Sequence, residues 1–156
     1  MKLLAEYEDF AKARNYVFTL LKFRNRSEQE IREKLKKKKC EQKTVEKTIQ
    51  YLKDVHFIDD RQFARDWIKA RLTKPFGFRR ISFELNQKGI DKDIIREELN
   101  EAKGNFPEGE IVVALARKMA KKYAKLDEAK IKRRIFGYLS RRGFNLEAIQ
   151  KAISRL

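Results

Sequence analysis

A pattern of apolar residues occurs three times along the chain and constrains its fold more than any other feature. Each copy has a leucine anchor, an isoleucine four residues before it and an apolar residue five after it; the anchors are Leu35, Leu85 and Leu139. Apolar residues recur again ten and fourteen positions after each anchor. A period of about fifty residues, with length changes confined to the links, is typical of an array of supersecondary units. Such arrays usually bind another macromolecule along an extended face.

The spacing within each copy predicts three helices. Before each anchor, apolar residues recur at intervals of four, as in Ala13, Val17 and Leu21, which is the period of one helix face. Hydrophobic residues make up 42% of the chain and charged residues 40%, with only two prolines and six glycines. We therefore predict an all-α protein of three tandem three-helix repeats in an elongated array. The predicted units are residues 1–58, 59–104 and 105–156.

Several residues mark predicted helix ends. Ser27 and Glu30 have the spacing of a capping box, in which each side chain binds a free backbone N–H at the helix start. One carboxylate of the pair Asp59-Asp60 is placed to cap the next unit. Gly89 and Gly143 are predicted to end helices in the left-handed conformation. The first unit has Lys39 at the corresponding position, and because lysine adopts that conformation less easily, we expect its turn to be built differently.

The formal charge of +16 is the second strong signal. A basic surplus of this size attracts polyanions, so we expect the partner to be nucleic acid or something coated with it. The single cysteine excludes an internal disulfide and fits a reducing compartment. No apolar run approaches the length that spans a bilayer, and early acidic residues interrupt any signal peptide. We expect a cytoplasmic monomer without membrane contact.

Residues that carry chemistry are scarce. One histidine, His56, and one cysteine cannot supply zinc-type spacing, and no glycine-rich phosphate loop or nucleophile constellation is present. We interpret His56 as a turn residue. Asp59 and Asp60 could bind magnesium or act as a general base in a nuclease, but their place at a helix start favours capping. We predict no enzyme activity, cofactor, metal or small-molecule substrate.

The spacing of the second and third helices also resembles a helix-turn-helix pair, and charge tests that interpretation. The predicted third helices carry net charges of 0, −2 and +1, whereas the second helices carry +3, +2 and +5. A recognition helix with Glu97, Glu98 and Glu101 would be repelled by phosphates. Reading of a specific DNA sequence by the third helices is therefore disfavoured, and the polyanion-binding face is expected elsewhere.

The candidate contacts are basic clusters and two loop aromatics. For any one basic cluster a solvated helix face is an equally good interpretation. Only the basic clusters taken together indicate a polyanion-binding surface. The outer units carry +6 and +8 and the middle one +2. Phe76 and Phe78, beside Arg79, are expected to be exposed, whereas Tyr7, Phe10, Phe18, Phe63, Trp67 and Phe144 have core spacing. The predicted contacts are Lys36, Lys37, Lys38, Lys39, Phe76, Phe78, Arg79, Arg80, Lys121, Lys122, Lys130, Lys132, Arg133, Arg134, Arg141 and Arg142.

Four ordered motifs give the chain a resemblance to the RecX family of regulators of the recombinase RecA. Residues 26–31 with Leu35 are similar to the family's R-S-x-x-E-L…L, and residues 57–64 to its aromatic-I-D-D-x-x-F-A segment. Residues 77–90 resemble its G-x-x-R-I-x-x-E-L-x-x-K-G-I core, and residues 142–144 its closing R-G-F. The chain departs from the family at His56 and Lys39, where glycine is expected.

The resemblance implies a three-repeat crescent that lies in the groove of the RecA filament on single- or double-stranded DNA. It also implies modulation, most often inhibition, of RecA's ATP hydrolysis, strand exchange and co-protease activity in the DNA-damage (SOS) response. The alternative from another class is a general basic nucleic-acid-binding module that does not depend on RecA.

Overall fold

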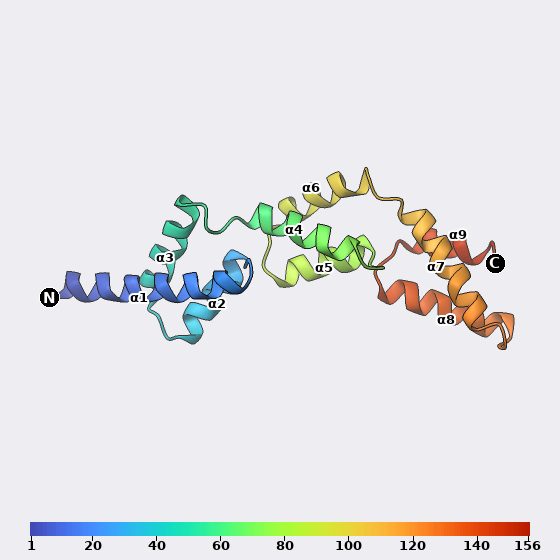
Figure 1. The fold of residues 1–156 in the computed structure, drawn as a ribbon, viewed down its shortest axis with the longest axis horizontal. Coiled ribbons are helices and arrows are strands. Elements are labelled where there is room, and N and C mark those ends of the chain that lie inside the picture. The colour runs from blue at the N-terminus through green and yellow to red at the C-terminus, as the bar shows by residue number, and fades with distance from the viewer.

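The structure, a computed structural model, describes residues 1–156 as nine α-helices without strands. The helices lie in three groups of three along an elongated array, and the two termini are at its opposite ends (Figure 1). This confirms the predicted all-α fold of tandem three-helix units. The bounds are α1 (Lys2–Phe23), α2 (Glu28–Lys37), α3 (Gln42–Asp54), α4 (Asp60–Leu72), α5 (Phe78–Gln87), α6 (Lys92–Lys103), α7 (Glu108–Lys122), α8 (Glu128–Arg141) and α9 (Leu146–Ile153).

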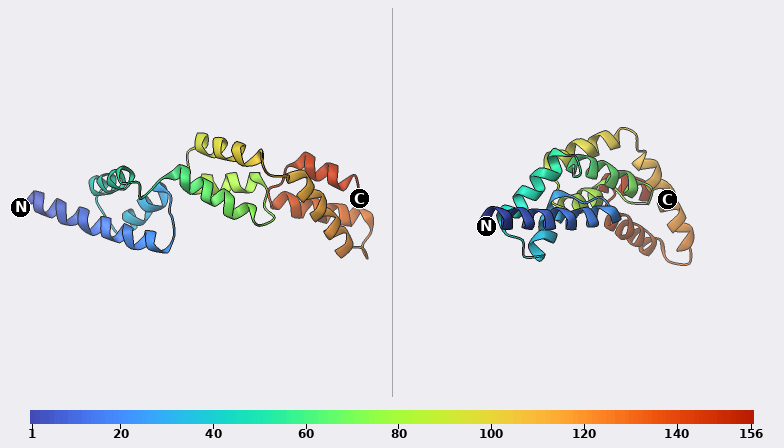
Figure 2. Two further views of the ribbon diagram at one scale, coloured as in Figure 1. Left: turned by 45° about the horizontal axis from the view of Figure 1, so that its top comes forward. Right: turned by 60° about the vertical axis from the view of Figure 1, so that its left-hand side comes forward.

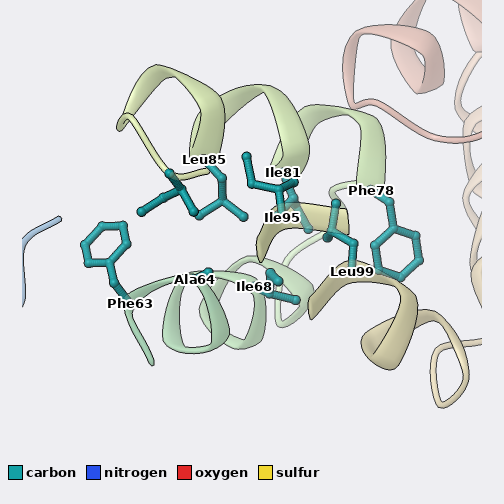
Figure 3. Packing of buried hydrophobic residues seen from close by; sticks show 9 residues of the cluster. Phe63, Ala64, Ile68, Phe78, Ile81, Leu85, Ile95 and Leu99 are labelled. Atoms are coloured by element: carbon teal, nitrogen blue, oxygen red, sulfur yellow. The ribbon is translucent and has the colours of Figure 1, made fainter. Parts of the chain in front are cut away.

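Each unit has a hydrophobic core of its own. The anchors Leu35, Leu85 and Leu139 are fully buried, one in each core. In the middle unit, side chains from α4, α5 and α6 meet around Ile81 and Leu85 (Figure 3). Phe106, which the predicted boundary at 104/105 assigns to the third unit, packs against this middle core. The predicted unit boundaries otherwise stay predictions.

The residue five positions after each anchor closes the second helix of its unit. The backbone N–H groups of Cys40, Ile90 and Phe144 donate to the anchor carbonyls of Leu35, Leu85 and Leu139 at 3.1, 3.2 and 3.3 Å. This is the long hydrogen bond of a Schellman motif, which requires a left-handed residue just before the donor. The five-residue spacing between each anchor and the following apolar residue therefore reflects the Schellman motif that ends each second helix.

The left-handed residues are Lys39 (φ 60°), Gly89 (φ 73°) and Gly143 (φ 83°). The prediction for the two glycines is confirmed, whereas the expectation of a different first turn is wrong. Lys39 adopts the same conformation as the glycines, at a cost of about 1–2 kcal/mol. The N–H groups of Lys39 and Cys40 hold it there by donating to the carbonyls of Lys36 and Leu35. His56, also left-handed at φ 58°, occupies the turn after α3 as predicted.

The helix starts are capped largely as the sequence indicates. Ser27 and Glu30 form the full capping box. The Asp59 carboxylate accepts from the N–H groups of Arg61 and Gln62 at the start of its own helix. Asp60 does not cap that helix: its carboxylate accepts from the N–H of Glu28, at 2.8 Å, and so caps α2 in the preceding unit. The sequence predicted that one carboxylate of the pair caps this helix, which Asp59 confirms. The role of Asp60 could not be predicted, because it depends on a contact with the neighbouring unit.

The second helices α2, α5 and α8 follow one another in a row along one side of the array (Figures 1 and 2). The start of α2 meets the end of α5 at a contact that we call the first joint. There the Ser27 hydroxyl donates to the Lys88 carbonyl at 2.6 Å, and the Lys88 ammonium donates to Glu30 at 2.9 Å. The units thus connect end to end, and the array bends into an arch (Figure 2, right).

The second joint repeats this arrangement between α5 and α8. The N–H groups of Gly77 and Arg79 donate to the carbonyls of Arg142 and Gly143 at 2.8 and 3.1 Å. Donors at the start of one helix thereby satisfy acceptors at the end of the next, and their dipoles align head to tail.

A half-buried carboxylate lies at each joint, at the same position in its unit. Asp60 and Glu108 are the first residues of α4 and α7. The backbone N–H groups of Asn145 and Phe78 act to lower the pKa of Glu108, as the N–H of Glu28 does for Asp60. Burial raises the pKa of both carboxyl groups above the ordinary value.

Close approach at the joints explains where glycine is required. A Cβ on Gly143 would lie 2.3 Å from the backbone nitrogen of Arg80, and one on Gly89 would lie 2.4 Å from Cβ of Gln29. In the structure no helix start packs against the turn of Lys39, and its side chain is exposed. A side chain is therefore tolerated at this turn, whereas at Gly89 and Gly143 a Cβ would collide with the neighbouring unit.

Acid is expected to weaken the first joint through Glu30. Burial of its carboxyl acts to raise the pKa, but hydrogen bonds from Arg24, Lys88 and the Ser27 N–H outweigh burial and lower the pKa to about 2. Because this lies below the ordinary 4.5, the carboxylate stabilises the fold above about pH 4.5, and that contribution is lost as the pH falls toward 2. Unfolding monitored by circular dichroism should show a smaller stability loss between pH 4.5 and 2 in Glu30→Gln. If Glu30→Gln lost as much stability over this pH range as the parent, the loss could not be assigned to Glu30.

Candidate polyanion-binding surface

The second joint brings together two basic pairs that lie far apart in the sequence. Arg79 and Arg80 lie in the first turn of α5, and Arg141 and Arg142 are the last residue and the C-cap of α8, where the two helices meet. The sequence predicts each pair as a candidate contact but not their proximity. We call Arg79, Arg80, Arg141 and Arg142 with Phe76 the joint cluster.

Phe76 orders the guanidinium groups of the joint cluster. The guanidinium carbons of Arg80 and Arg142 lie 4.7 and 5.0 Å from the centre of its ring, and that of Arg71 lies 5.4 Å away. Cation–π contact of this kind favours a fixed arrangement of cations over a set of freely moving side chains. Phe76 is half-buried under them, so it organises the cluster more than it offers a free face.

Glu84 holds the side chains of Trp67, Arg71 and Arg80 in place beside the joint cluster. Its carboxylate accepts from Trp67, Arg71 and Arg80 at 3.0, 2.7 and 3.0 Å. Burial of Glu84 acts to raise its pKa, but hydrogen bonds from Arg80 and Trp67 outweigh burial, and the pKa lies below the ordinary value. The ionised carboxylate neutralises part of the charge of Arg71 and Arg80. It forms no ion pair with Arg79 or Arg141, which stay available to a ligand.

An open cleft of about 870 Å³ crosses the joint between these residues. Arg79 and Arg141 line it, and neither forms an ion pair in the structure. The lining contains five cationic side chains and one carboxylate, that of Glu84. A concave surface with unpaired guanidinium groups favours phosphate or carboxylate ligands, since arginine can bind either with two parallel hydrogen bonds.

A second group of predicted residues gathers around Tyr123 at the far end of the third unit. The cationic groups of Lys122 and Arg134 lie 5.7 and 5.1 Å from its ring centre. Lys121 and Arg133 are exposed nearby in sequence. Lys130 and Lys132 pair with Asp127 and Glu128, so their charge is already partly compensated.

The four lysines Lys36, Lys37, Lys38 and Lys39 are all exposed at the end of α2, in the first unit. Positive charge there is favourable because the carbonyl end of a helix carries partial negative charge. Lys38 also lies 5.1 Å from the ring centre of Tyr16. The predicted contacts therefore fall into three sites along the array.

Two aromatic predictions are wrong. Phe78 is buried, with 6% of its surface exposed, and packs edge to face on Phe106 at 5.3 Å between ring centres. Sequence placed it in a loop, whereas it is the first residue of α5 and belongs to the middle core. Tyr7, expected in the core, is 63% exposed, because the first two turns of α1 extend beyond the packed part of the unit.

Sequence reasoning missed Trp67, Arg71, Phe83 and Glu84. For Glu84 a signal existed, since it stands four residues after Arg80 on one helix face. Phe83 carried a signal too, because it is a large apolar residue that falls outside the core spacing of Ile81 and Leu85. Trp67 and Arg71 come from α4 and reach the cluster only through tertiary packing.

The two carboxylates considered for catalysis, those of Asp59 and Asp60, cap helix starts. Asp59 caps α4 and Asp60 caps α2, so both carboxylates already accept hydrogen bonds from N–H groups. No group of three His, Cys, Asp or Glu side chains is arranged to hold a metal ion. No helix combines the length and apolar character needed to cross a bilayer.

The third helices show no sign of a DNA-reading role. Glu98 is buried at 4% exposure and pairs with Arg61 and Arg65, both at 2.7 Å. These contacts tie α6 to α4, which makes Glu98 a packing residue. The side of α6 that faces α4 carries Glu97 and Glu98 and is therefore poorly suited to phosphate.

Three family models match the chain in order along its length. They are RecX, first three-helix domain, at residues 13–52, RecX, second three-helix domain, at 59–99, and RecX, third three-helix domain, at 108–153. The chain belongs to the RecX family. The suspected resemblance is thereby confirmed, and each RecX domain coincides with one of the three hydrophobic cores.

Individual RecX proteins agree with this assignment. The chain is 33% identical to Regulatory protein RecX of Prosthecochloris aestuarii, covering 95% of both chains. It is 31% identical to Regulatory protein RecX of Clostridium beijerinckii, covering all of this chain and 73% of that protein. The crystal structure of RecX from Lactobacillus salivarius superposes with a TM-score of 0.83 at 25% identity, covering 96% of this chain and 97% of that one. The chain is thus a member of a family of regulatory proteins.

Proposed function

We propose that this RecX-family chain is a non-enzymatic regulator that lies in the groove of the RecA filament on DNA and inhibits RecA's ATPase, strand exchange and co-protease activity. The observation that carries the proposal is the ordered match of all three RecX domains over residues 13–153. The net charge of +16 supports it, since a RecA filament holds a polyanion.

The arrangement of the array suits a long partner. Cationic sites lie at the end of α2, at the second joint and around Tyr123, so contact is spread over all three units. A curved, end-to-end row of helices would bridge adjacent RecA protomers and impede the movements that ATP turnover requires. The joints keep the sites in register, because each is held by hydrogen bonds to backbone carbonyls at a helix end.

The test compares single-stranded DNA that is bare with DNA coated by RecA and a non-hydrolysable nucleotide, at near-physiological salt. Clear preference for the coated strand, with loss of RecA's DNA-dependent ATPase at equimolar protein, is the expected result. Unchanged ATPase, strand exchange and repressor cleavage would refute the proposal.

A second candidate function is a general basic nucleic-acid-binding module, and the unpaired Arg79 and Arg141 in an open cleft favour it. It requires equal or tighter binding to bare DNA. With about six phosphate contacts, log K would fall with log salt at a slope of roughly −4 to −5. Magnesium-dependent cleavage of DNA, lost in Asp60→Asn, would instead support a nuclease.

A further inference from the structure

Phe83 stands exposed between two cationic hollows of the middle unit. Its side chain is on α5 and is 59% exposed. On one side it borders the cleft of about 870 Å³ at the second joint, and on the other a hollow of about 610 Å³ between α5 and α6. Arg79 lines both, and Lys92 and Lys103 line the second. A large apolar ring is thus presented to solvent with cations on either side.

Packing does not account for this ring. Phe83 belongs to none of the three cores and pairs with no other aromatic ring. Phe76 and Phe78, on the same segment, are respectively covered by arginines and buried against Phe106. Phe83 is therefore the aromatic residue of the second joint whose face is free.

We infer that Phe83, Arg79 and Arg141 form a binding site for single-stranded nucleic acid, in which the Phe83 ring stacks on one base and the two guanidinium groups bind the flanking phosphates. The site rests on the proposed function and deepens it, because it assigns the second joint as the face of the array that meets nucleic acid. Single-strand-binding proteins combine a cationic groove with aromatic platforms in this way, since every base offers a π-face.

The lining favours a nucleic acid strand over a protein partner. Only two apolar residues, Trp67 and Phe83, line the cleft at the joint, and Trp67 donates its N–H to Glu84. A protein interface would surround an aromatic anchor with apolar groups and place few charges at its centre. Here the exposed neighbours of the ring are mainly arginine, lysine, glutamine, asparagine and serine side chains. The hollow between α5 and α6 also includes Phe78, Ile95 and Leu99, but these belong to the middle core and are at most 6% exposed.

Single-stranded rather than duplex nucleic acid fits the site. In a duplex the bases are stacked on each other and present only their edges in the grooves. A ring that stands above the surface can stack only on a base that is already unstacked. The two hollows on either side of Phe83 give the flanking phosphates cationic partners.

The experiment measures fluorescence anisotropy with the full chain and two labelled probes: an oligothymidylate of about 20 nucleotides and an abasic strand of the same length. Phe83→Ala should weaken binding of oligothymidylate about tenfold, from the loss of one stacked base, and leave binding of the abasic strand unchanged. Phe83→Tyr, which keeps the ring, should bind both probes like the parent. The matched control is Phe23→Ala, since Phe23 is 80% exposed and lies outside both hollows.

Two results would overturn the inference. One is unchanged or equally reduced binding of both probes by Phe83→Ala, which would make the ring a surface feature without stacking. The other is that Phe83→Ala binds both bare probes normally but binds RecA-coated DNA more weakly in the separate RecA assay described above, which would make Phe83 a protein contact. Because RecA is absent from the two-probe assay, the stacking result and the RecA result can succeed or fail separately.

Discussion

Replacement of Arg79 and Arg141 together by glutamate is expected to weaken binding of single-stranded DNA about a hundredfold, roughly tenfold for each reversed charge. Both guanidinium groups line the cleft at the second joint, and no carboxylate neutralises either one. The salt dependence should also fall, by about one unit of log–log slope for each lost phosphate contact. Titrations of a labelled oligonucleotide at several salt concentrations measure both quantities.

The control for this variant removes the same charge from a different face. Arg117 and Arg155 line a hollow between α7 and α9 and form no ion pair. Arg117→Glu with Arg155→Glu produces the same net charge and should weaken binding much less. Equal losses in the two double variants would mean that net charge, and not the joint cluster, controls binding. The same pair of variants tested in the RecA ATPase assay separates the two candidate functions.

Gly143→Ala is expected to destabilise the third unit and its joint by about 3 kcal/mol. The new Cβ would lie 2.3 Å from the backbone nitrogen of Arg80, and the residue is left-handed at φ +83°. Strain in that conformation costs about 1–2 kcal/mol, and overpacking against backbone costs about 1–3 kcal/mol. Chemical denaturation gives the change in the free energy of unfolding. Amide exchange of Gly77 and Arg79, whose N–H groups cross the joint, should become faster.

Comparison of Gly143→Ala with alanine substitutions at the two corresponding turns tests whether the loss of stability comes from contact between units. Gly89→Ala meets the side chain of Gln29 rather than backbone, so a smaller loss is expected. Lys39→Ala has the same left-handed turn without a neighbouring unit and already carries a Cβ, so its stability should change by less than about 0.5 kcal/mol. A loss in Lys39→Ala as large as in Gly143→Ala would show that turn strain alone, and not contact between units, explains the effect.

Local features of the fold could be predicted from the sequence because their causes are local. The capping box of Ser27 and the turns at Gly89 and Gly143 depend on residues within one helix turn, and each was confirmed. The three anchors were correct for the same reason, since each follows from the spacing in its own unit.

Features that depend on how the units meet could not be predicted. Lys39 was misjudged because whether a left-handed turn needs glycine depends on what packs against it. Phe78 was misjudged because Phe106, from the link to the next unit, covers it. The basic pairs of the second joint were each predicted, but their meeting is set by the hydrogen bonds between Gly77 and Arg142 and between Arg79 and Gly143.

The separation of the three cores has a consequence for how the chain folds. The principal helix packings, such as α1 on α3, α4 on α6 and α7 on α9, all lie within one unit. Contacts of such short sequence separation have a small loop-closure cost and form rapidly. The first unit holds all its core residues by Ile58, before the later ones leave the ribosome. We expect each unit to become protected from proteolysis in turn during synthesis, with the joints closing after the units that they connect.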